Sequence, residues 1–534
     1  MSNNQKAIYV IFMGIAIILG IGIGRMLNFK NSVALGFESH NKDKIENLLQ
    51  YINEEYVDTI QTDSIVDVVI RDILKNLDPH SVYIPKQEVA AVDEELEGAF
   101  TGIGVLFQQY KDTFTVIRPL DNSPAIKAGL RAMDRIIMIN NDTVAGKKLD
   151  INELSKKIKG KAGTGIRMTI YRKSNDSLFE IKITRSKIPL VSVPAHFMLN
   201  DTLGFIKLTT FAANTYDEFH RAVKNLKQKG MTALVLDLRD NTGGLLNQAD
   251  LIADEFLPNG KIIFYTKDQK GHQKIVSATS RGSFENGKIY VLINENSASA
   301  SEIVAGALQD NDKATIIGRR SYGKGLVQKE MVLSDGSKVR LTTARYYTPT
   351  GRSIQRPYKK GHKKEYEEDF KKRLYNGELY YKDSIHVVDS LKYTTPKGKV
   401  VYGGGGIVPD IFVPKTYDDY LYSYGYINRF LSDFITDYLD RHLDELQAYT
   451  AEDFMADHQI EQQLYQLFKS RHGKNNTSKH KIRNPKAEQY LKQLMKALLG
   501  RDLYGTNVYY QILLQNDPML DTLLHQPKQT ADVK

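Results

Sequence analysis

No cysteine occurs anywhere in this sequence of 534 residues. Its absence excludes disulfide bonds, a thiol nucleophile and metal sites built from thiolates, and it fits any redox compartment. Disorder is not indicated either, since 41% of the residues are hydrophobic and 25% are charged, as in ordinary folded proteins. The chain is too long for one hydrophobic core, so we expect a multidomain protein of roughly three to five structural units.

Nucleic-acid-binding motifs are absent as well. The formal net charge is +10, but the excess of Lys and Arg is spread along the chain and is densest in residues 359–373 and 469–486. With no such motif beside them, these stretches are interpreted as solvated surface. We therefore expect no nucleic-acid partner.

The start of the chain carries one long uncharged run. It covers residues 7–24, between Lys6 and Arg25, and eighteen residues just span the hydrocarbon core of a bilayer. A cleaved signal peptide is the alternative, but the run is long for one, and no small-x-small cleavage site with a polar mature start follows it. We expect residues 1–30 to form an uncleaved membrane anchor, whose orientation the roughly balanced flanking charges do not fix.

The rest of the chain divides by its hydrophobic spacing. From the N-terminal side, hydrophobic residues first recur at helical spacing and then form short runs typical of β-strands. Predicted strands next alternate with predicted helices, and the last part of the chain again has helical spacing. Alternating strands and helices are typical of a layered α/β domain. The predicted parts are a helical N-terminal region at 31–96, a β-rich module at 97–187, an α/β domain at 188–414 with a charged, Tyr-rich surface insertion at 358–399, and a helical C-terminal domain at 415–534.

The same patterns predict individual elements. The expected strands of the β-rich module are Phe114–Ile117, Arg135–Ile139, Arg167–Tyr171 and Phe179–Ile183. Those of the α/β domain are Leu203–Leu208, Ala233–Arg239, Lys288–Asn294, Ala314–Arg319 and Lys338–Tyr347. Its helices are expected near Tyr216–Gln228, Leu246–Phe256 and Ala300–Gln309.

The most informative segment is NSASASE at 296–302, where an expected strand ends and an amphipathic helix begins. Ser299 and Glu302 fit a capping box, Ser-x-x-Glu before an apolar run, and taken alone this serine is a helix cap. The same position also suits a nucleophile, because free backbone N–H groups and the positive end of the helix dipole stabilise a developing oxyanion. Ser299 is therefore a candidate nucleophile as well as a cap.

A serine nucleophile needs a base, and none of the twelve histidines lies in a recognisable motif beside this segment. The candidate base is Lys324 in YGKGLVQ at 322–328, where glycines allow close approach of the backbone and apolar neighbours provide cover. A lone lysine between glycines is otherwise a simple turn. To act as a base near neutral pH, the lysine must lower its pKa from about 10.4 by roughly three units through burial, at about 4 kcal/mol.

These two segments resemble the active-site signature of the C-terminal processing peptidases. The resemblance implies that Ser299 is the nucleophile, that Lys324 is the general base, and that Gln328 holds the lysine amine. It also implies a crotonase-like α/β serine protease core and covers about residues 51–414. Further matches are LDPHS at 77–81, in which His80 is expected to be structural, YTPTGRSIQ at 347–355 and GIVPDI at 406–411.

Another segment of this resemblance, LDLRDNTGG at 236–244, follows an expected strand. Taken alone it is a strand-to-helix turn that needs glycine. The resemblance implies an oxyanion hole made by the N–H of Ala300 and that of either Gly243 or Gly244.

The same segment contains two supporting polar residues by resemblance, Asp237 and Arg239, whose roles the sequence does not define. It also departs from the family pattern. That pattern more often has a third glycine or an asparagine where this chain has Asp240 and Thr242, so the loop shape stays open.

The β-rich module resembles a PDZ domain, through GIGV at 102–105 and DNSPAIKAGL at 121–130 before a DRI triplet. A plain β-turn is the alternative for an isolated Gly-x-Gly. Consecutive backbone N–H groups suit a peptide carboxylate, and the sheet edge pairs with its main chain. Met133 stands where the family usually has glycine, so we expect a different backbone conformation there. The implied peptide-binding residues are Gly102, Ile103, Gly104 and Val105.

Together these features predict a serine endopeptidase with a Ser-Lys dyad that needs no metal or cofactor and selects proteins with accessible apolar C-termini. Because the resembled family works outside the cytoplasm, the anchor implies a single-pass inner-membrane protein with its catalytic part on the periplasmic or extracytoplasmic side and with envelope proteins as substrates. Two other classes stay open: a non-catalytic PDZ scaffold in which the serine is only a cap, and a serine hydrolase with a histidine base. A homo-oligomer or an adaptor partner is also left open.

Overall fold

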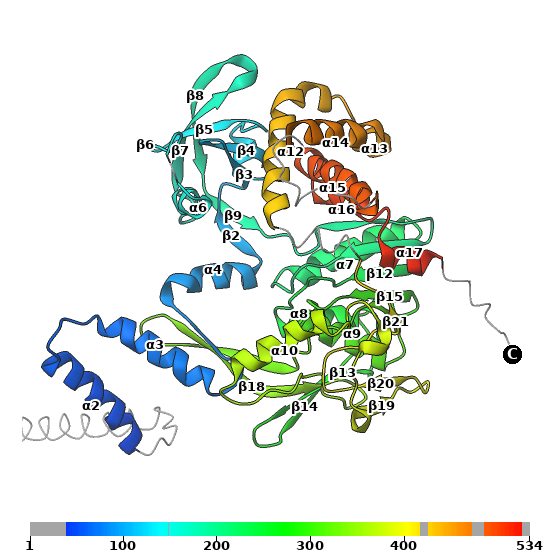
Figure 1. Ribbon diagram of the computed structural model, residues 1–534. Helices are drawn as coiled ribbons and strands as arrows, with labels where there is room; N and C mark the ends of the chain where they lie inside the picture. The colour runs from blue at the N-terminus through cyan, green and yellow to red at the C-terminus, as the bar shows by residue number, and fades with distance from the viewer. Residues whose placement is uncertain (1–38, 148, 417–424, 473–484, 526–534) are drawn as a thin grey trace, which may run out of the picture. The chain divides into compact units, whose positions relative to one another are not determined.

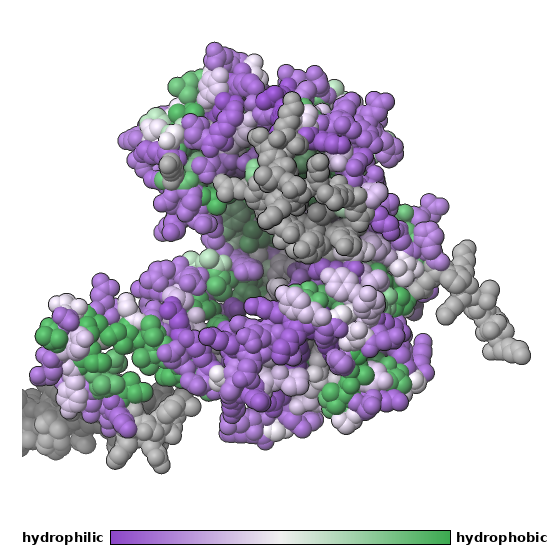
Figure 2. All heavy atoms as spheres, viewed as in Figure 1, coloured by the Kyte–Doolittle hydropathy of each residue, from purple (hydrophilic) through white to green (hydrophobic). Residues whose placement is uncertain are grey.

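The computed structural model describes residues 39–147, 149–416, 425–472 and 485–525 (Figure 1). These residues fall into two compact units divided after Ile73. The first unit holds helix α2 (Ser39–Glu55) and most of α3 (Thr62–Lys75), as the helical spacing predicts. Both helices expose apolar side chains, which Figure 2 shows as hydrophobic surface: Ile45, Leu48, Val68, Val69 and Ile73.

The predicted membrane anchor, residues 1–30, lies outside the described residues. Among the helices that the structure describes, none is long and apolar enough to cross a membrane. The predicted single-pass inner-membrane location, with a periplasmic catalytic part, is therefore corrected and withdrawn, because no described helix supplies the span on which it depended.

In the second unit, the β-rich module follows helix α4 (Lys86–Glu97). Its sheet has the strand order β3-β4-β5-β7-β8, with β6 paired to β5, so β3 is an edge strand bonded to β4 alone. All four expected strands are present. The elements are β2 (Ala99–Gly102), β3 (Val105–Tyr110), β4 (Thr113–Pro119), α5 (Pro124–Lys127), β5 (Arg135–Ile139), β6 (Asp142–Thr143), α6 (Ile151–Ile158), β7 (Gly165–Arg172), β8 (Ser177–Thr184) and β9 (Ser186–Pro189).

Met133 corrects one expectation about this module. Its φ is 65°, in the left-handed region where glycine has no steric cost, so the turn keeps a glycine-type conformation. The residue is held there because its side chain is buried and its N–H donates to the carbonyl oxygen of Val116 at 2.8 Å. The expected change of backbone conformation is therefore wrong.

The α/β domain is built on a sheet of order β10-β11-β12-β15-β16-β21. Strand β10 is antiparallel to β11, and all the other pairs are parallel. Parallel strands have both faces covered, so they are apolar on both faces. The strands are β10 (Ala195–Met198), β11 (Leu203–Lys207), β12 (Ala233–Asp237), β15 (Lys288–Ile293), β16 (Ala314–Gly318) and β21 (Ile411–Phe412).

Different helices cover the two faces of this sheet (Figure 1). Helices α7 (Thr215–Gln228), α8 (Leu246–Asp254) and α9 (Ala300–Asp310) pack against one face. The last described helix, α17 (Pro518–Leu524), packs on the other. The C-terminal end of the described chain therefore contributes to the core of the α/β domain.

A second sheet has the order β1-β18-β13-β14, and β17 also pairs with β18. Sequence patterns predict only β18 among these strands. The insertion adds helix α10 and strand β19, which pairs with β20 directly after the insertion. The elements are β1 (Val82–Ile84), β13 (Ile262–Asp268), β14 (Gln273–Ser277), β17 (Leu326–Val332), β18 (Lys338–Tyr347), α10 (Lys363–Tyr375), β19 (Lys392–Thr394) and β20 (Val400–Tyr402).

The C-terminal part is helical, as its pattern predicts. Its first helix contacts the edge strand of the β-rich module, where Gln108 bonds to Asp433 at 3.1 Å and Tyr110 donates to Asp437. The helices are α12 (Gly425–Leu446), α13 (Ala451–Ala456), α14 (Gln459–His472), α15 (Pro485–Tyr504), α16 (Thr506–Leu513) and α17.

Candidate active site

Ser299 lies in the tight turn between β15 and α9, with φ 56° and ψ −112°. A positive φ is uncommon for a residue with a side chain, and such strain gathers at functional sites. The N–H of Ser299 donates to the Glu302 carboxylate at 2.9 Å, which is one half of the expected capping box. The turn thus places the serine at the start of helix α9. The N–H groups of Ser301 and Glu302 donate to the carbonyl oxygens of Ala298 and Ser299, whereas that of Ala300 has no backbone partner among the described residues.

The other two serines of the triplet have structural partners. The hydroxyl of Ser297 donates to the carbonyl oxygen of Leu238 at 2.8 Å, and that of Ser301 donates to the carbonyl oxygen of Asn241 at 2.8 Å. Both are fully buried. They fasten the nucleophile turn to the loop after β12, which leaves Ser299 as the serine that faces the cavity.

Glu302 joins the nucleophile segment to the base segment. One carboxylate oxygen accepts the hydroxyl of Ser321 and the N–H of Gly323 (2.6 Å), and the other accepts the N–H groups of Lys324 (2.8 Å) and Ser299 (2.9 Å). Burial raises the pKa of this carboxyl group, while the four donors oppose that rise. The sequence predicts Glu302 as a cap but gives no sign of its bonds to the lysine segment.

The amine of Lys324 is oriented by two successive contacts. It donates to Oε1 of Gln328 at 2.8 Å, and the amide of Gln328 in turn donates to the carbonyl oxygen of His80 at 2.6 Å. Burial, with a further contribution from Arg340, lowers the pKa of Lys324 to about 8, although two carboxylates act in the opposite direction. An amine with this pKa is neutral in an appreciable fraction near pH 7, as a lysine base requires.

Ser299 and Lys324 line one cavity of about 490 Å³. No hydrogen bond joins Ser299 Oγ to Lys324 Nζ among the described residues, and such bonds often form only when substrate is bound. No histidine lines this cavity in the part of the chain that the structure describes. Apolar side chains form much of its wall: Val92, Leu96, Leu245, Leu246, Ile303, Leu326 and Val327.

His80 supports the site through its backbone. Its ring nitrogen Nε2 lies 3.1 Å from the hydroxyl of Tyr366, and its N–H donates to Asp78 at 2.9 Å. Burial, followed by the charge of Lys324, lowers the pKa of His80 to about 3. A neutral imidazole bonded to a tyrosine fits the structural role expected for this residue.

The glycine pair after β12 approaches the nucleophile closely. A Cβ atom on Gly243 would lie 2.8 Å from Cβ of Ser299 and 3.0 Å from N of Ala300, so only glycine fits there. The N–H of Gly243 donates to the side chain of Asn241 at 2.9 Å, whereas that of Gly244 has no bonded partner among the described residues. The structure thus brings both predicted glycines beside the predicted nucleophile.

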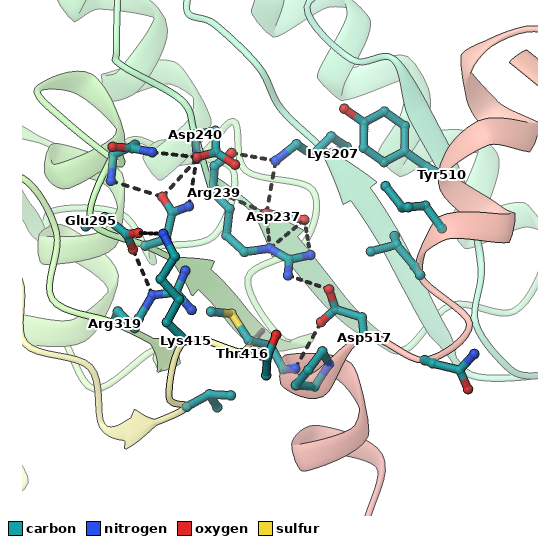
Figure 3. A pocket seen from close by; sticks show the side chains of 18 of the residues that line it. Lys207, Asp237, Arg239, Asp240, Glu295, Arg319, Lys415, Thr416, Tyr510 and Asp517 are labelled. Atoms are coloured by element: carbon teal, nitrogen blue, oxygen red, sulfur yellow. Dashed lines mark hydrogen bonds and ion pairs between the residues drawn. The ribbon is translucent and has the colours of Figure 1, made fainter. Parts of the chain in front are cut away.

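Asp237 and Arg239 lie at the start of the same loop and line a different cavity (Figure 3). The guanidinium group forms a fork with the carboxylate, at 2.6 Å from Nη2 to Oδ2 and 3.0 Å from Nε to Oδ1. Lys207 adds a bond to Asp237 at 3.2 Å. Burial favours a higher pKa for Asp237, but the two cations outweigh it and lower the pKa to about 2. The pair is therefore ionised and supports the loop without reaching the nucleophile's cavity.

The predicted peptide-binding loop lies next to edge strand β3. Gly104 adopts φ 73°, and a Cβ atom there would lie 2.4 Å from Cβ of Ser123. The carbonyl oxygens of Ile103 and Gly104 accept backbone N–H groups, while the N–H groups of these two residues have no backbone partner among the described residues. The loop and the unpaired edge have the form that β-augmentation by a peptide requires.

No group of three or more His, Asp or Glu side chains in the described ranges is arranged to hold a metal ion. The site consists instead of a strained serine, a buried lysine and backbone N–H groups.

Comparisons with known proteins agree with this architecture. The model of peptidase family S41 matches residues 202–364, the PDZ domain model matches 101–183, and a family of unknown function, DUF8443, matches 421–505. The carboxy-terminal-processing protease of Bartonella bacilliformis is 38% identical over 313 residues, which cover 58% of this chain and 71% of that protein. A probable CtpA-like serine protease of Staphylococcus aureus is 34% identical, over 64% of this chain and 67% of that protein.

A solved structure, the photosystem II D1 C-terminal processing protease, is 26% identical and covers 69% of this chain and 86% of that chain, with a TM-score of 0.36. Fold, site and relatives define a serine-type peptidase that carries a PDZ domain. The chain belongs to peptidase family S41, the family of the carboxy-terminal-processing proteases.

The lowered pKa of Lys324 leads to a prediction about pH. If its neutral amine is the base, kcat should rise as the pH passes through about 8, the pKa of this amine. Since the charge of Arg340 helps to lower that pKa, Arg340→Gln should move the midpoint to higher pH. Peptide cleavage measured between pH 6 and 10 checks both expectations.

Arg167→Gln is the matched control, because this exposed arginine lies in the PDZ domain and, among the described residues, its side chain forms one ion pair, with Glu180 at 3.6 Å. Its pH midpoint should equal that of the unchanged protein. Equal midpoints for Arg340→Gln and the unchanged protein would contradict the electrostatic account of the lysine pKa.

Proposed function

We propose that this chain is a serine endopeptidase with a Ser299–Lys324 dyad, which cleaves proteins that its PDZ domain selects by their C-terminal tails. The observation that carries the proposal is the buried Lys324 amine, with its pKa lowered to about 8, in the same cavity as a strained serine. Glu302 bonds to the backbone of both residues, which keeps their segments together.

The chemistry proposed follows from these positions. Neutral Lys324 takes the proton of the Ser299 hydroxyl while the oxygen attacks the scissile carbonyl carbon. The tetrahedral intermediate then collapses, the C–N bond breaks, and the lysine gives its proton to the leaving amine. Water attacks the resulting ester with the lysine again as base, and the released serine recovers its proton. Gln328 accepts a hydrogen bond from the amine and limits its movement within the cavity that also contains Ser299.

We assign the oxyanion hole to the N–H groups of Ala300 and Gly244. The N–H of Gly243 is engaged by Asn241, which favours the second glycine as the donor. Gly243 would then be required for space, because any side chain would collide with the nucleophile turn. Preorganised backbone donors of this kind stabilise the developing negative charge without reorganisation.

Substrate choice is assigned to the PDZ loop at residues 102–105 and to strand β3. Backbone N–H groups of the loop would hold the tail carboxylate, and β3 would pair with the main chain of the last residues. The last side chain would enter an apolar pocket. We do not propose envelope proteins as the substrate class, because that expectation depended on the single-pass membrane location.

Tail selection predicts that one protein substrate, offered with a free, an amidated and a charged-residue C-terminus, is cleaved at different rates. Amidation removes the carboxylate and its charge-assisted hydrogen bonds, each worth about 1.5 to 3 kcal/mol at best. Binding and cleavage of the amidated form should therefore weaken by tenfold or more, and the charged last residue should also be disfavoured. Kd and kcat/KM for the three forms are the measurements.

A short peptide that lacks a tail able to reach the PDZ domain is the control, and it should be cleaved equally well with either C-terminus. Equal cleavage of all three protein forms would exclude selection by the tail while leaving the dyad untouched.

A further inference from the structure

Helix α17 meets the α/β domain at the carboxyl ends of the parallel strands, where a cavity of about 400 Å³ is rich in charged side chains (Figure 3). We define the oxyanion loop as residues 237–244, which run from this cavity to the glycine pair beside Ser299. Asp517 bonds to this loop from a position far along the chain. We propose that Asp517 is a positioning residue that holds the oxyanion loop in its active form, an inference that rests on the proposed function.

Asp517 makes two kinds of bond with its two carboxylate oxygens. One oxygen caps α17 by accepting the N–H groups of Met519 (3.0 Å) and Leu520 (3.1 Å). The other accepts Nη1 of Arg239 at 2.6 Å. A bond between a guanidinium and a carboxylate that are both largely buried is stronger than one exposed to water.

The helix that carries Asp517 is anchored in the core. Met519, Leu520 and Leu523 are 3%, 2% and 7% exposed, and they share a hydrophobic cluster with the strands of the sheet. The methionine side chain packs against Gly318, since a Cβ atom there would lie within 3.0 Å of its sulfur. Asp517 is therefore fixed relative to the sheet and is not a flexible surface arm.

Arg239 connects Asp517 to the start of the oxyanion loop. Its guanidinium bonds to Asp237 as well as to Asp517, and Lys207 donates both to Asp237 and to the carbonyl oxygen of Arg239. Burial alone would lower the pKa of Arg239, but Asp237 and Asp517 raise it well above its ordinary value. Asp237 thus bonds to two cations, Lys207 and Arg239, and the guanidinium of Arg239 bonds to two carboxylates, those of Asp237 and Asp517.

Asp240 and Asn241, which follow Arg239 in the loop, are bonded to the segment before Ser299. Asp240, at φ 59°, accepts amide N–H groups from Asn294 (2.9 Å) and Asn296 (2.8 Å). The carbonyl oxygen of Asn241 accepts the N–H of Ala298 at 3.0 Å, and its side chain accepts the N–H of Gly243. A displacement at Arg239 would therefore change the position of Gly244, the glycine donor of the oxyanion hole.

This arrangement gives the last helix a catalytic effect at a distance. Loss of the Asp517 charge leaves Arg239 with one carboxylate partner in a largely buried site and frees one end of the loop. The transition state then loses part of its oxyanion stabilisation, whereas the PDZ loop and the lysine are unaffected. The effect should therefore appear in kcat, with KM and the pH midpoint unchanged.

The test is Asp517→Asn in the full chain, because asparagine caps a helix about as well as aspartate but carries no charge. We expect kcat for a short peptide to fall tenfold or more, KM to stay within twofold, and labelling of Ser299 by a fluorophosphonate to slow in parallel. Asp517→Ser, another good cap without charge, should behave in the same way. Arg239→Gln combined with Asp517→Asn should lose little more than Arg239→Gln alone, since both act through one contact.

Thr450→Ala is the matched control, because Thr450 caps α13 through the N–H of Asp453 and has no contact with the loop. It should lower the melting temperature with kcat unchanged. A kcat for both Asp517 variants within twofold of the unchanged protein would overturn the proposal, as would additive losses in the double variant. Failure of the proposed function is separate, since it would appear as cleavage by Ser299→Ala.

Discussion

Replacing Ser299 by alanine is expected to abolish peptide-bond cleavage, with a loss of about 10⁴-fold or more, as for removal of a nucleophile in other serine proteases. The fold should survive, because the bond from the Ser299 N–H to Glu302 does not involve the hydroxyl. Loss of a helix cap costs only about 1 kcal/mol. Cleavage of a protein substrate and thermal unfolding of the same preparation are the two measurements.

Ser470→Ala is the comparison variant, since this exposed serine on α14 also donates to a backbone carbonyl oxygen, that of Leu467 at 2.8 Å, and does not line the cavity. It should lose at most about 1 kcal/mol of stability through one hydrogen bond and keep its activity. Undiminished cleavage by Ser299→Ala would assign the nucleophile elsewhere. A folded Ser299→Ala protein that still binds tails would show that binding and cleavage are separate functions of this chain.

Lys324→Arg is expected to be inactive at every pH, because a guanidinium does not lose its proton in proteins. Lys324→Ala should also be inactive, with a loss of at least 10²- to 10⁴-fold for removal of a general base. The alanine variant leaves room in the cavity, so a small primary amine added to the buffer should restore part of its activity. Initial rates between pH 6 and 10, with and without added amine, provide the check.

Lys329→Arg is the matched control, because Lys329 lies on the same strand β17 and is exposed to solvent. It should cleave at the rate of the unchanged protein. An active Lys324→Arg protein would exclude the lysine base and would favour a serine hydrolase with a different base. The structure offers no histidine for that role among the described residues that line the cavity.

Sequence patterns predict the four central strands of the α/β sheet, β11, β12, β15 and β16, because those strands are buried and continuously apolar, but they miss β10 and β21 at its edges. They miss β17 and the β13–β14 hairpin. Most side chains of β17 are partly or fully exposed, and β14 is polar, so neither has the alternation on which a strand prediction depends. The strand that carries Gln328 is thus recognisable only through family resemblance.

The reactive residues of the candidate site were predictable from the sequence, whereas the long-range contacts that hold them in place were less so. Ser299, Lys324 and Gln328 lie in short motifs, so local spacing suffices to find them. The contact of Gln328 with His80 joins residues 248 positions apart, and that of Arg239 with Asp517 joins residues 278 positions apart. Such contacts depend on tertiary packing, and Asp517 has no motif around it. Glu302 was predictable only in part, because its capping role follows from the sequence motif and its bonds to Gly323 and Lys324 do not.

The most direct test of the Ser-Lys dyad is covalent labelling of the unchanged protein with a fluorophosphonate, followed by mass-spectrometric mapping and by the rate of labelling as a function of pH. We expect one label, on Ser299, and a rate that rises as the pH passes through about 8, because the neutral amine of Lys324 activates the hydroxyl. A label on another residue, or a labelling rate that does not change between pH 6 and 10, would contradict it.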